Sequence, residues 1–153
     1  MISVKQVSKI IERVGGPMYL ISHKMGKSWK YLHVQICHYR QKNMPFSPKL
    51  AKLFLDTVGE STYRGIVSKE LYELCSMDYF LSREQFQKFL TLLKCSHPQL
   101  ASVLHMNKKG FYMVLYNNGG LNFNTTKMLF ENYPLEMSKV LTKIQLEIIF
   151  DHL

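Results

Sequence analysis

The chain has 153 residues, and its 20 Lys and Arg against 11 Asp and Glu give a formal net charge of +9. This length can bury a sizeable core, as one domain or as two small ones. No apolar run approaches the roughly 18 residues that a membrane span needs, and the N-terminus lacks the features of a signal peptide, so we expect a cytoplasmic protein that does not enter a membrane.

The first 60 residues predict four helices, because each stretch of helical apolar periodicity follows a residue that begins helices. The initiating residues are Ser3, Pro17, Ser28 and the pair Ser47-Pro48. The helices are expected over 4–14, 17–25, 29–39 and from 48 onwards. Gly15-Gly16 and Gly26 end the first two helices.

The rest of the chain also predicts helices, and strand signals are scarce. Residues 61–81 are expected to form a polar linker with one short helix. Further helices are expected over 83–94, 97–104, 108–116 and 125–133. Residues 135–153 then carry a wide apolar face on one more helix, which either folds back on its own domain or forms a dimerisation surface. That face consists of Met137, Val140, Leu141, Ile144, Ile148 and Ile149.

A shift of 79 residues places the first half of the chain on the second. Both halves then open with a Ser-x-x-Gln capping box, at Ser3 and at Ser82. The apolar stripe Val7, Ile10, Ile11 and Val14 becomes Phe86, Phe89, Leu90 and Leu93, and Leu50 and Phe54 become Leu129 and Tyr133. We therefore expect a duplicated helical domain, with copies at 1–60 and 82–134.

Two short amphipathic patterns meet at His105 in the second copy. Their apolar positions are Leu100, Leu104, Met106, Phe111 and Val114, with the small Ala101 where a neighbouring helix would cross. This spacing resembles the helix-turn-helix of the lambda-repressor-like (Cro/repressor-type) superfamily, in which Gly usually stands where this chain has His105. The first copy supplies that glycine as Gly26, but it has Lys27 and Gln35 where apolar residues are expected.

The resemblance implies an all-α protein: two tandem lambda-repressor-like helix-turn-helix domains with an added C-terminal helix. It also implies a sequence-specific regulator of transcription that binds double-stranded DNA, in bacteria or their mobile elements, where it would be associated with the nucleoid. Further partners under this hypothesis are a second copy of the chain, bound through the C-terminal helix, and RNA polymerase or another regulator.

The charge pattern favours a polyanionic partner independently of the resemblance. No acidic residue lies between Glu12 and Asp56, and eight basic residues do. They are Arg13, Lys24, Lys27, Lys30, Arg40, Lys42, Lys49 and Lys52. Such a one-sided field attracts polyanions with an affinity that falls steeply with salt. The alternative is a surface that only makes the protein soluble.

A helix-turn-helix inserts the start of its second helix into the major groove, which identifies the candidate DNA contacts. The candidates for reading bases are Ser28, Trp29, Lys30 and His33 in the first copy and Asn107, Lys108, Lys109, Tyr112 and Met113 in the second. The candidates for phosphate contacts are Lys24, Lys27, Arg40, Lys42 and Lys49. Three of these residues have structural alternatives: Trp29 in a core, Asn107 as a helix cap only, and Tyr112 in packing.

Other functions have less support in the sequence. The few acidic residues are scattered without a pair suited to general acid–base catalysis, and the histidines lack a metal-binding spacing, so we expect no enzyme, cofactor or metal. Three cysteines without a Cys-x-x-Cys pair are typical of reduced thiols. The remaining rivals are a protein-interaction module on a helix-turn-helix scaffold and a non-specific nucleic-acid binder.

Overall fold

The computed structural model describes residues 1–116 and 119–153, without the side chains of residues 114–116. The side chain of Val114, part of the predicted helix-turn-helix pattern, therefore lies outside the described residues. Within these residues the chain forms twelve helices and one two-stranded antiparallel sheet, which confirms the expected all-α class. The chain divides into two compact units, residues 1–77 with 150–153, and residues 78–149.

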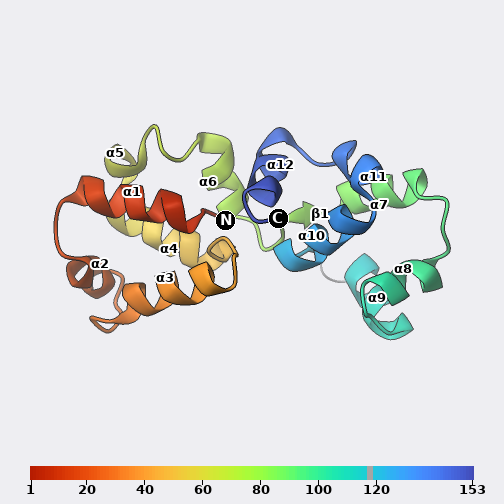
Figure 1. Ribbon diagram of the computed structural model, residues 1–153, viewed down its shortest axis with the longest axis horizontal. Helices are drawn as coiled ribbons and strands as arrows, with labels where there is room; N and C mark the ends of the chain where they lie inside the picture. Colours follow the sequence, from red (N-terminus) through yellow and green to blue (C-terminus); the bar gives the residue numbers. More distant parts are fainter. Residues whose placement is uncertain (117–118) are drawn as a thin grey trace. The chain divides into compact units, whose positions relative to one another are not determined.

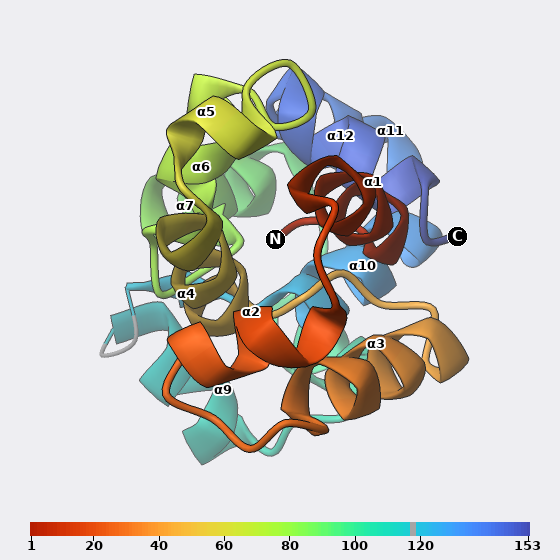
Figure 2. The same cartoon turned by 90° about the vertical axis from the view of Figure 1, so that its left-hand side faces the viewer.

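The first unit contains six helices in three layers (Figure 1). They are α1 (Val4–Val14), α2 (Met18–Lys24), α3 (Tyr31–Gln41), α4 (Pro48–Val58), α5 (Glu60–Tyr63) and α6 (Lys69–Cys75). Figure 2 shows α1 and α4 in the middle, with α2 and α3 on one side and α5 and α6 on the other. The fully buried side chains Ile10, Leu32, Phe46, Phe54 and Leu55 form its core.

The second unit repeats this succession. Its elements are β1 (Leu81–Ser82), α7 (Arg83–Leu92), α8 (His97–Val103), α9 (Lys108–Tyr116), β2 (Gly120–Leu121), α10 (Phe123–Asn132), α11 (Pro134–Ser138) and α12 (Lys143–Phe150). Again α8 and α9 lie on one side of α7 and α10, with α11 and α12 on the other (Figure 1). Gly120 permits the close pairing of the two strands, because a Cβ there would overlap the carbonyl oxygen of Leu81.

Corresponding hydrogen bonds occur within each of the two units. Ser3 and Ser82 both form the predicted capping box with the glutamine three residues later. The Nε2 of Gln6 then donates to the carbonyl oxygen of Ile66 at 3.2 Å, and the Nε2 of Gln85 donates to that of Val140 at 2.9 Å. Each glutamine thus links the first helix of its unit to the segment before the last helix.

The correspondence changes register within the repeat, which corrects the single shift of 79 residues. That shift holds as far as α2 and α8. From the caps of α4 and α10, Ser47 and Asn122, it is 75 residues, so Phe54 corresponds to the buried Leu129 and not to Tyr133. From the caps Ser68 and Thr142 onwards it is 74 residues. The connections between α3 and α4 and between α9 and α10 are equally long. Most of the change arises because α9 ends five residues after Phe111, whereas α3 ends nine residues after the corresponding Leu32.

The last part of each unit has a different structure from the one that we predicted. Residues 61–77, which we predicted to belong to a linker, form parts of α5 and all of α6, and α6 packs on α4 inside the first unit. Residues 135–153, expected as one added helix, form most of α11 and all of α12, which correspond to α5 and α6. Met137, Leu141, Ile148 and Ile149 are buried there, which favours the alternative that this segment folds back on its own chain.

Candidate nucleic-acid interface

The turn between α2 and α3 begins with the same backbone conformation as the turn between α8 and α9. Gly26 has φ 70° and His105 has φ 51°, the left-handed conformation expected at this position. The next amide donates back to the carbonyl oxygen five residues earlier, from Lys27 to Ser22 at 3.0 Å and from Met106 to Ala101 at 2.9 Å. The two helix pairs therefore meet through the same kind of corner.

The start of α3 differs from the sequence prediction. The helix begins at Tyr31 and not at Trp29, and the side chain of Ser28 does not cap it. Instead, the carbonyl oxygen of Ser28 accepts from the amide of Tyr31 at 3.0 Å in a turn that precedes the helix. Ser28, Trp29 and Lys30 are thus exposed residues of this turn, and His33 is exposed in the first turn of α3.

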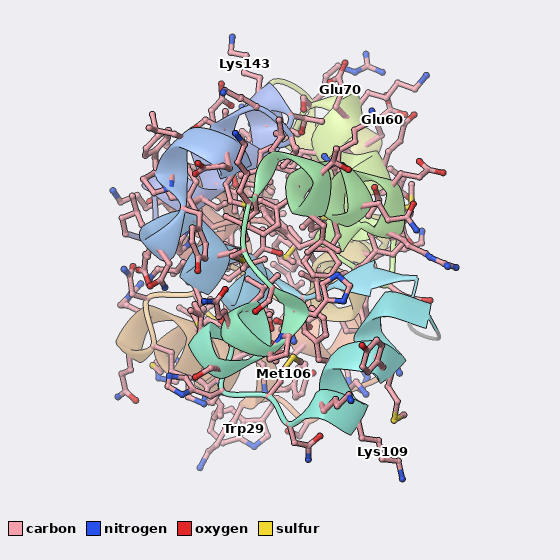
Figure 3. The ribbon with its side chains drawn as sticks, turned by 90° about the vertical axis from the view of Figure 1, so that its right-hand side faces the viewer. Trp29, Glu60, Glu70, Met106, Lys109 and Lys143 are labelled. Atoms are coloured by element: carbon pink, nitrogen blue, oxygen red, sulfur yellow. The ribbon has the colours of Figure 1, made fainter. Side chains whose placement is uncertain are left out.

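Trp29 lies outside the core of the first unit. Its side chain is 66 % exposed, which excludes the alternative in which it packs inside the unit. Figure 3 shows it extending away from the ribbon. The ammonium of Lys30 stands 4.7 Å from the centre of its ring, and the ammonium of Lys27 stands 5.5 Å from that of Tyr31. These cation–π contacts hold cations and rings together on one surface.

Six cations are exposed on and beside α2 and α3. They are Lys24, Lys27, Lys30, Arg40, Lys42 and Lys49, and we call them the cationic face of the first unit. In the part of the chain that the structure describes, none of them forms an ion pair. No carboxylate of the described residues therefore stands within ion-pair distance of these cations.

Three acidic residues of the first unit pair with cations on and beside α4, α5 and α6. Ion pairs join Lys52 to Asp56 at 3.0 Å, Arg64 to Glu60 at 3.2 Å and Lys69 to Glu73 at 3.9 Å. The hydroxyl of Tyr72 donates to Asp56 at 2.6 Å, and this hydrogen bond, with that from Lys52, lowers the pKa of Asp56. Hydrogen bonds to Tyr72 and then Asp56 raise the pKa of Lys52.

In the second unit, α9 begins at Lys108 as the sequence predicted. Asn107 caps it, with its Oδ1 accepting from the amide of Gly110 at 2.7 Å. Lys108, Lys109 and Met113 are exposed, and Figure 3 shows Lys109 pointing away from the ribbon. Tyr112 is half-buried, with its ring 6.2 Å from that of Phe111 and 6.3 Å from that of His97.

The sequence interpretation missed a second acid-free segment. No acidic residue lies between Glu84 and Glu131, so α8 and α9 stand in an acid-free stretch just as α2 and α3 do. The acidic residues of the second unit lie before this stretch or at the end of α10 and in α11 and α12, namely Asp78, Glu84, Glu131, Glu136 and Glu147. A comparison of acid positions between the repeats would have revealed this signal.

The structure offers little for other kinds of site. Within residues 1–116 and 119–153, no three His, Cys, Asp or Glu side chains gather where they could hold a metal ion. The Nε2 of His33 and the Sγ of Cys37 lie 3.7 Å apart on α3, as a pair. Among the described residues, none of the helices combines the length and the apolar character that crossing a membrane requires.

No protein-family model matches the chain, and comparisons with curated proteins and with solved structures found no similar chain. The function is therefore argued from the geometry and charge of the two units.

Proposed function

We propose that the protein binds double-stranded DNA through α3 and α9, which act as the second helices of tandem helix-turn-helix motifs, and that it regulates transcription without catalysis. The observation that carries this proposal is the sorting of charge in each unit. Acid-free sequence forms both helix pairs, and in the first unit the exposed cations of that pair lack carboxylate partners.

The dimensions of α3 fit this role. Its eleven residues give a rod about 16 Å long at the usual helical rise, and the major groove of B-DNA, about 12 Å wide, admits such a helix. Lys24, Lys27 and Lys30 stand before it and Arg40 and Lys42 at its end. These cations would then contact phosphates on both sides of the groove, while Trp29, Lys30 and His33 face the bases.

The second unit would contribute fewer contacts. Lys108 and Lys109 are exposed at the start of α9, where a lysine can read guanine. Asn107 already uses its Oδ1 to cap α9, so an adenine contact would have to use its amide nitrogen or break the cap. We therefore expect the first unit to supply most of the affinity and the second to add sequence preference.

The experiment that tests the proposal is selection of bound sequences from a random duplex pool at near-physiological salt. A regulator that reads bases enriches a defined motif, whereas a non-specific binder retains DNA without enrichment. Retention of no DNA would refute the proposal.

The cationic face also predicts a salt dependence. If its six cations all contact phosphates, the logarithm of the binding constant falls with the logarithm of salt with a slope of about −5. Lys30→Gln with Lys42→Gln should weaken binding to every duplex and reduce that slope by about 2. Lys69→Gln on α6 is the control and should leave the slope unchanged.

Substitutions in α9 separate base reading from general attraction. Lys108→Ala with Lys109→Ala should change which sequence is selected, since these side chains stand where base edges would be read. An unchanged motif would assign all sequence reading to the first unit.

A second candidate function is binding of another protein, and apolar exposure on the first unit favours it. Tyr19 and Leu20 on α2 and Val34 on α3 are each more than two fifths exposed, as is Trp29. Leu20→Gln distinguishes the two functions, because α2 does not enter the groove in the DNA proposal. Normal DNA binding with loss of regulation in cells would support a protein partner at this patch.

A further inference from the structure

The corner between α8 and α9 contains a pocket of about 310 Å³. Its lining residues come from both helices and the turn between them: His97, Pro98, Ala101, Ser102, Met106, Lys108, Phe111 and Tyr112. Figure 3 shows Met106 between the two helices. The volume lies at the small end of the range for small-molecule sites, about 300–1,000 Å³.

A difference between the repeats lies beside the pocket. In the first unit the hydroxyl of Ser22 on α2 accepts from the amide of Leu32 on α3 at 3.0 Å and so links the two helices. Ala101 occupies the corresponding place in the second unit and has no hydroxyl. The amide of Phe111, which corresponds to Leu32, donates instead to the carbonyl oxygen of Asn107 at 3.0 Å.

The lining combines aromatic rings with a single permanent charge. The ring of Phe111 lies 5.6 Å from that of His97 and 6.2 Å from that of Tyr112, and the thioether of Met106 adds a polarisable wall. Lys108 carries the permanent charge, and none of the lining residues is acidic.

We propose that this pocket binds a small, planar aromatic carboxylate. The aromatic ring lies among His97, Phe111 and Tyr112, and the carboxylate pairs with the ammonium of Lys108. This inference goes beyond DNA binding and does not depend on it, because the pocket lies within one helix corner of the second unit.

The test follows amide NMR shifts of the full chain during titration with naphthoate, with naphthalenemethanol as the uncharged control. We expect saturable shifts at the lining residues with naphthoate and binding about tenfold weaker with the alcohol, which lacks the charge-assisted contact. Shifts that never saturate, or that map to the cationic face of the first unit, would overturn the proposal.

Three variants make the test specific. Lys108→Gln should weaken naphthoate about tenfold and leave the alcohol unaffected, while Lys109→Gln, outside the lining, should change neither. Ala101→Ser adds a hydroxyl to the pocket lining and should crowd a bound ring, so both compounds should lose affinity. Equal naphthoate binding by the parent protein and Lys108→Gln would also refute the proposal.

Discussion

The helix pairs α2–α3 and α8–α9 have the same corner but different surfaces. Both corners have a residue with positive φ followed by the same backward hydrogen bond. Around the first pair stand the six cations of the cationic face and an exposed tryptophan, whereas Lys108 and Lys109 are the exposed cations at the start of α9. The two pairs share the hydrogen bonds that fix the backbone of the corner and differ in the residues that face solvent.

Ion pairs away from these corners, by contrast, recur in both units. Lys52 with Asp56 corresponds to Lys127 with Glu131, and Lys69 with Glu73 corresponds to Lys143 with Glu147. Each pair joins residues four apart on the outer side of a helix, and such pairs add little stability. The repeat therefore preserves the charge of the side opposite the helix corners, which supports a functional difference between the two sides.

The largest expected effect comes from the corresponding core residues Phe54 and Leu129. Both are fully buried, so Phe54→Ala should destabilise the first unit by about 3–5 kcal/mol and Leu129→Ala the second by about 2–5 kcal/mol. Hydrogen exchange with mass spectrometry should show the greatest loss of protection in α1 and α4 for the first substitution and in α7 and α10 for the second. The opposite pattern would contradict the assignment of these residues to separate cores.

The bridging glutamines should differ in importance. Gln85 bonds to Gln145 as well as to Val140, whereas Gln6 has Ile66 as its bridging partner. We expect Gln85→Ala to cost about 2–3 kcal/mol and Gln6→Ala about 1–2 kcal/mol, because more buried hydrogen bonds are lost in the second unit.

Gln99→Ala is the matched control for these two substitutions. Gln99 completes the capping box of α8 but forms no bridge, and it is exposed. Its loss should cost about 1 kcal/mol or less, as for a helix cap alone. Urea unfolding measures the free energy of unfolding of all three variants. Equal losses in the three would show that the hydrogen bonds to Ile66 and Val140 add no stability.

Local signals in the sequence were sufficient to predict most helices. Ser3, Ser47 and Ser82 each cap the helix that they were expected to begin, and α9 has the predicted bounds. Caps depend on neighbours within four residues, so a single sequence contains the necessary information. The start of α3 was wrong because the exposed turn at Trp29 and Lys30 was read as helix.

Relations between distant residues were harder to predict. The changes of register at Asn122 and Thr142 follow from where helices such as α9 end, which apolar periodicity does not determine. The counterpart of α6 was missed because Gln145, buried among hydrogen bonds to Gln85, Thr142 and Phe80, occupies the place of the apolar Leu71. The pocket beside α9 is lined by residues of two helices and the turn between them, and the loss of the Ser22 hydrogen bond at Ala101 becomes visible only when the two folded corners are compared.

Two substitutions at the helix corners should change stability in opposite directions. Gly26→Ala places a Cβ on a residue with φ 70°, where nearby space is open but the backbone is strained, and should cost about 1 kcal/mol. His105→Gly removes the corresponding strain at φ 51° and should stabilise the second unit by up to about 1 kcal/mol. Thermal unfolding should show shifts of opposite sign, and a stabilising Gly26→Ala would contradict the left-handed corner.

The smallest expected effect distinguishes the Lys52–Asp56 pair from its counterpart Lys127–Glu131. Tyr72 donates to Asp56 and lowers its pKa below the ordinary value of 3.8, so ionised Asp56 stabilises the folded state. This contribution is present above the pKa of the unfolded chain and is lost as the pH falls through the lower pKa of the folded state. Asp56 is half exposed, so Asp56→Asn should cost less than about 1 kcal/mol near neutral pH.

Glu131→Gln is the control, because Leu146 stands in the second unit where Tyr72 stands in the first, and the ion pair there is longer, at 3.8 Å. Urea unfolding near pH 7 and again near pH 3 should show a cost for Asp56→Asn that shrinks in acid, with a smaller cost for Glu131→Gln at the higher pH. If Asp56→Asn costs the same at both pH values, the ionised carboxylate contributes nothing to folding. If Glu131→Gln costs as much as Asp56→Asn near pH 7, the tyrosine hydrogen bond is not what distinguishes the two units at this place.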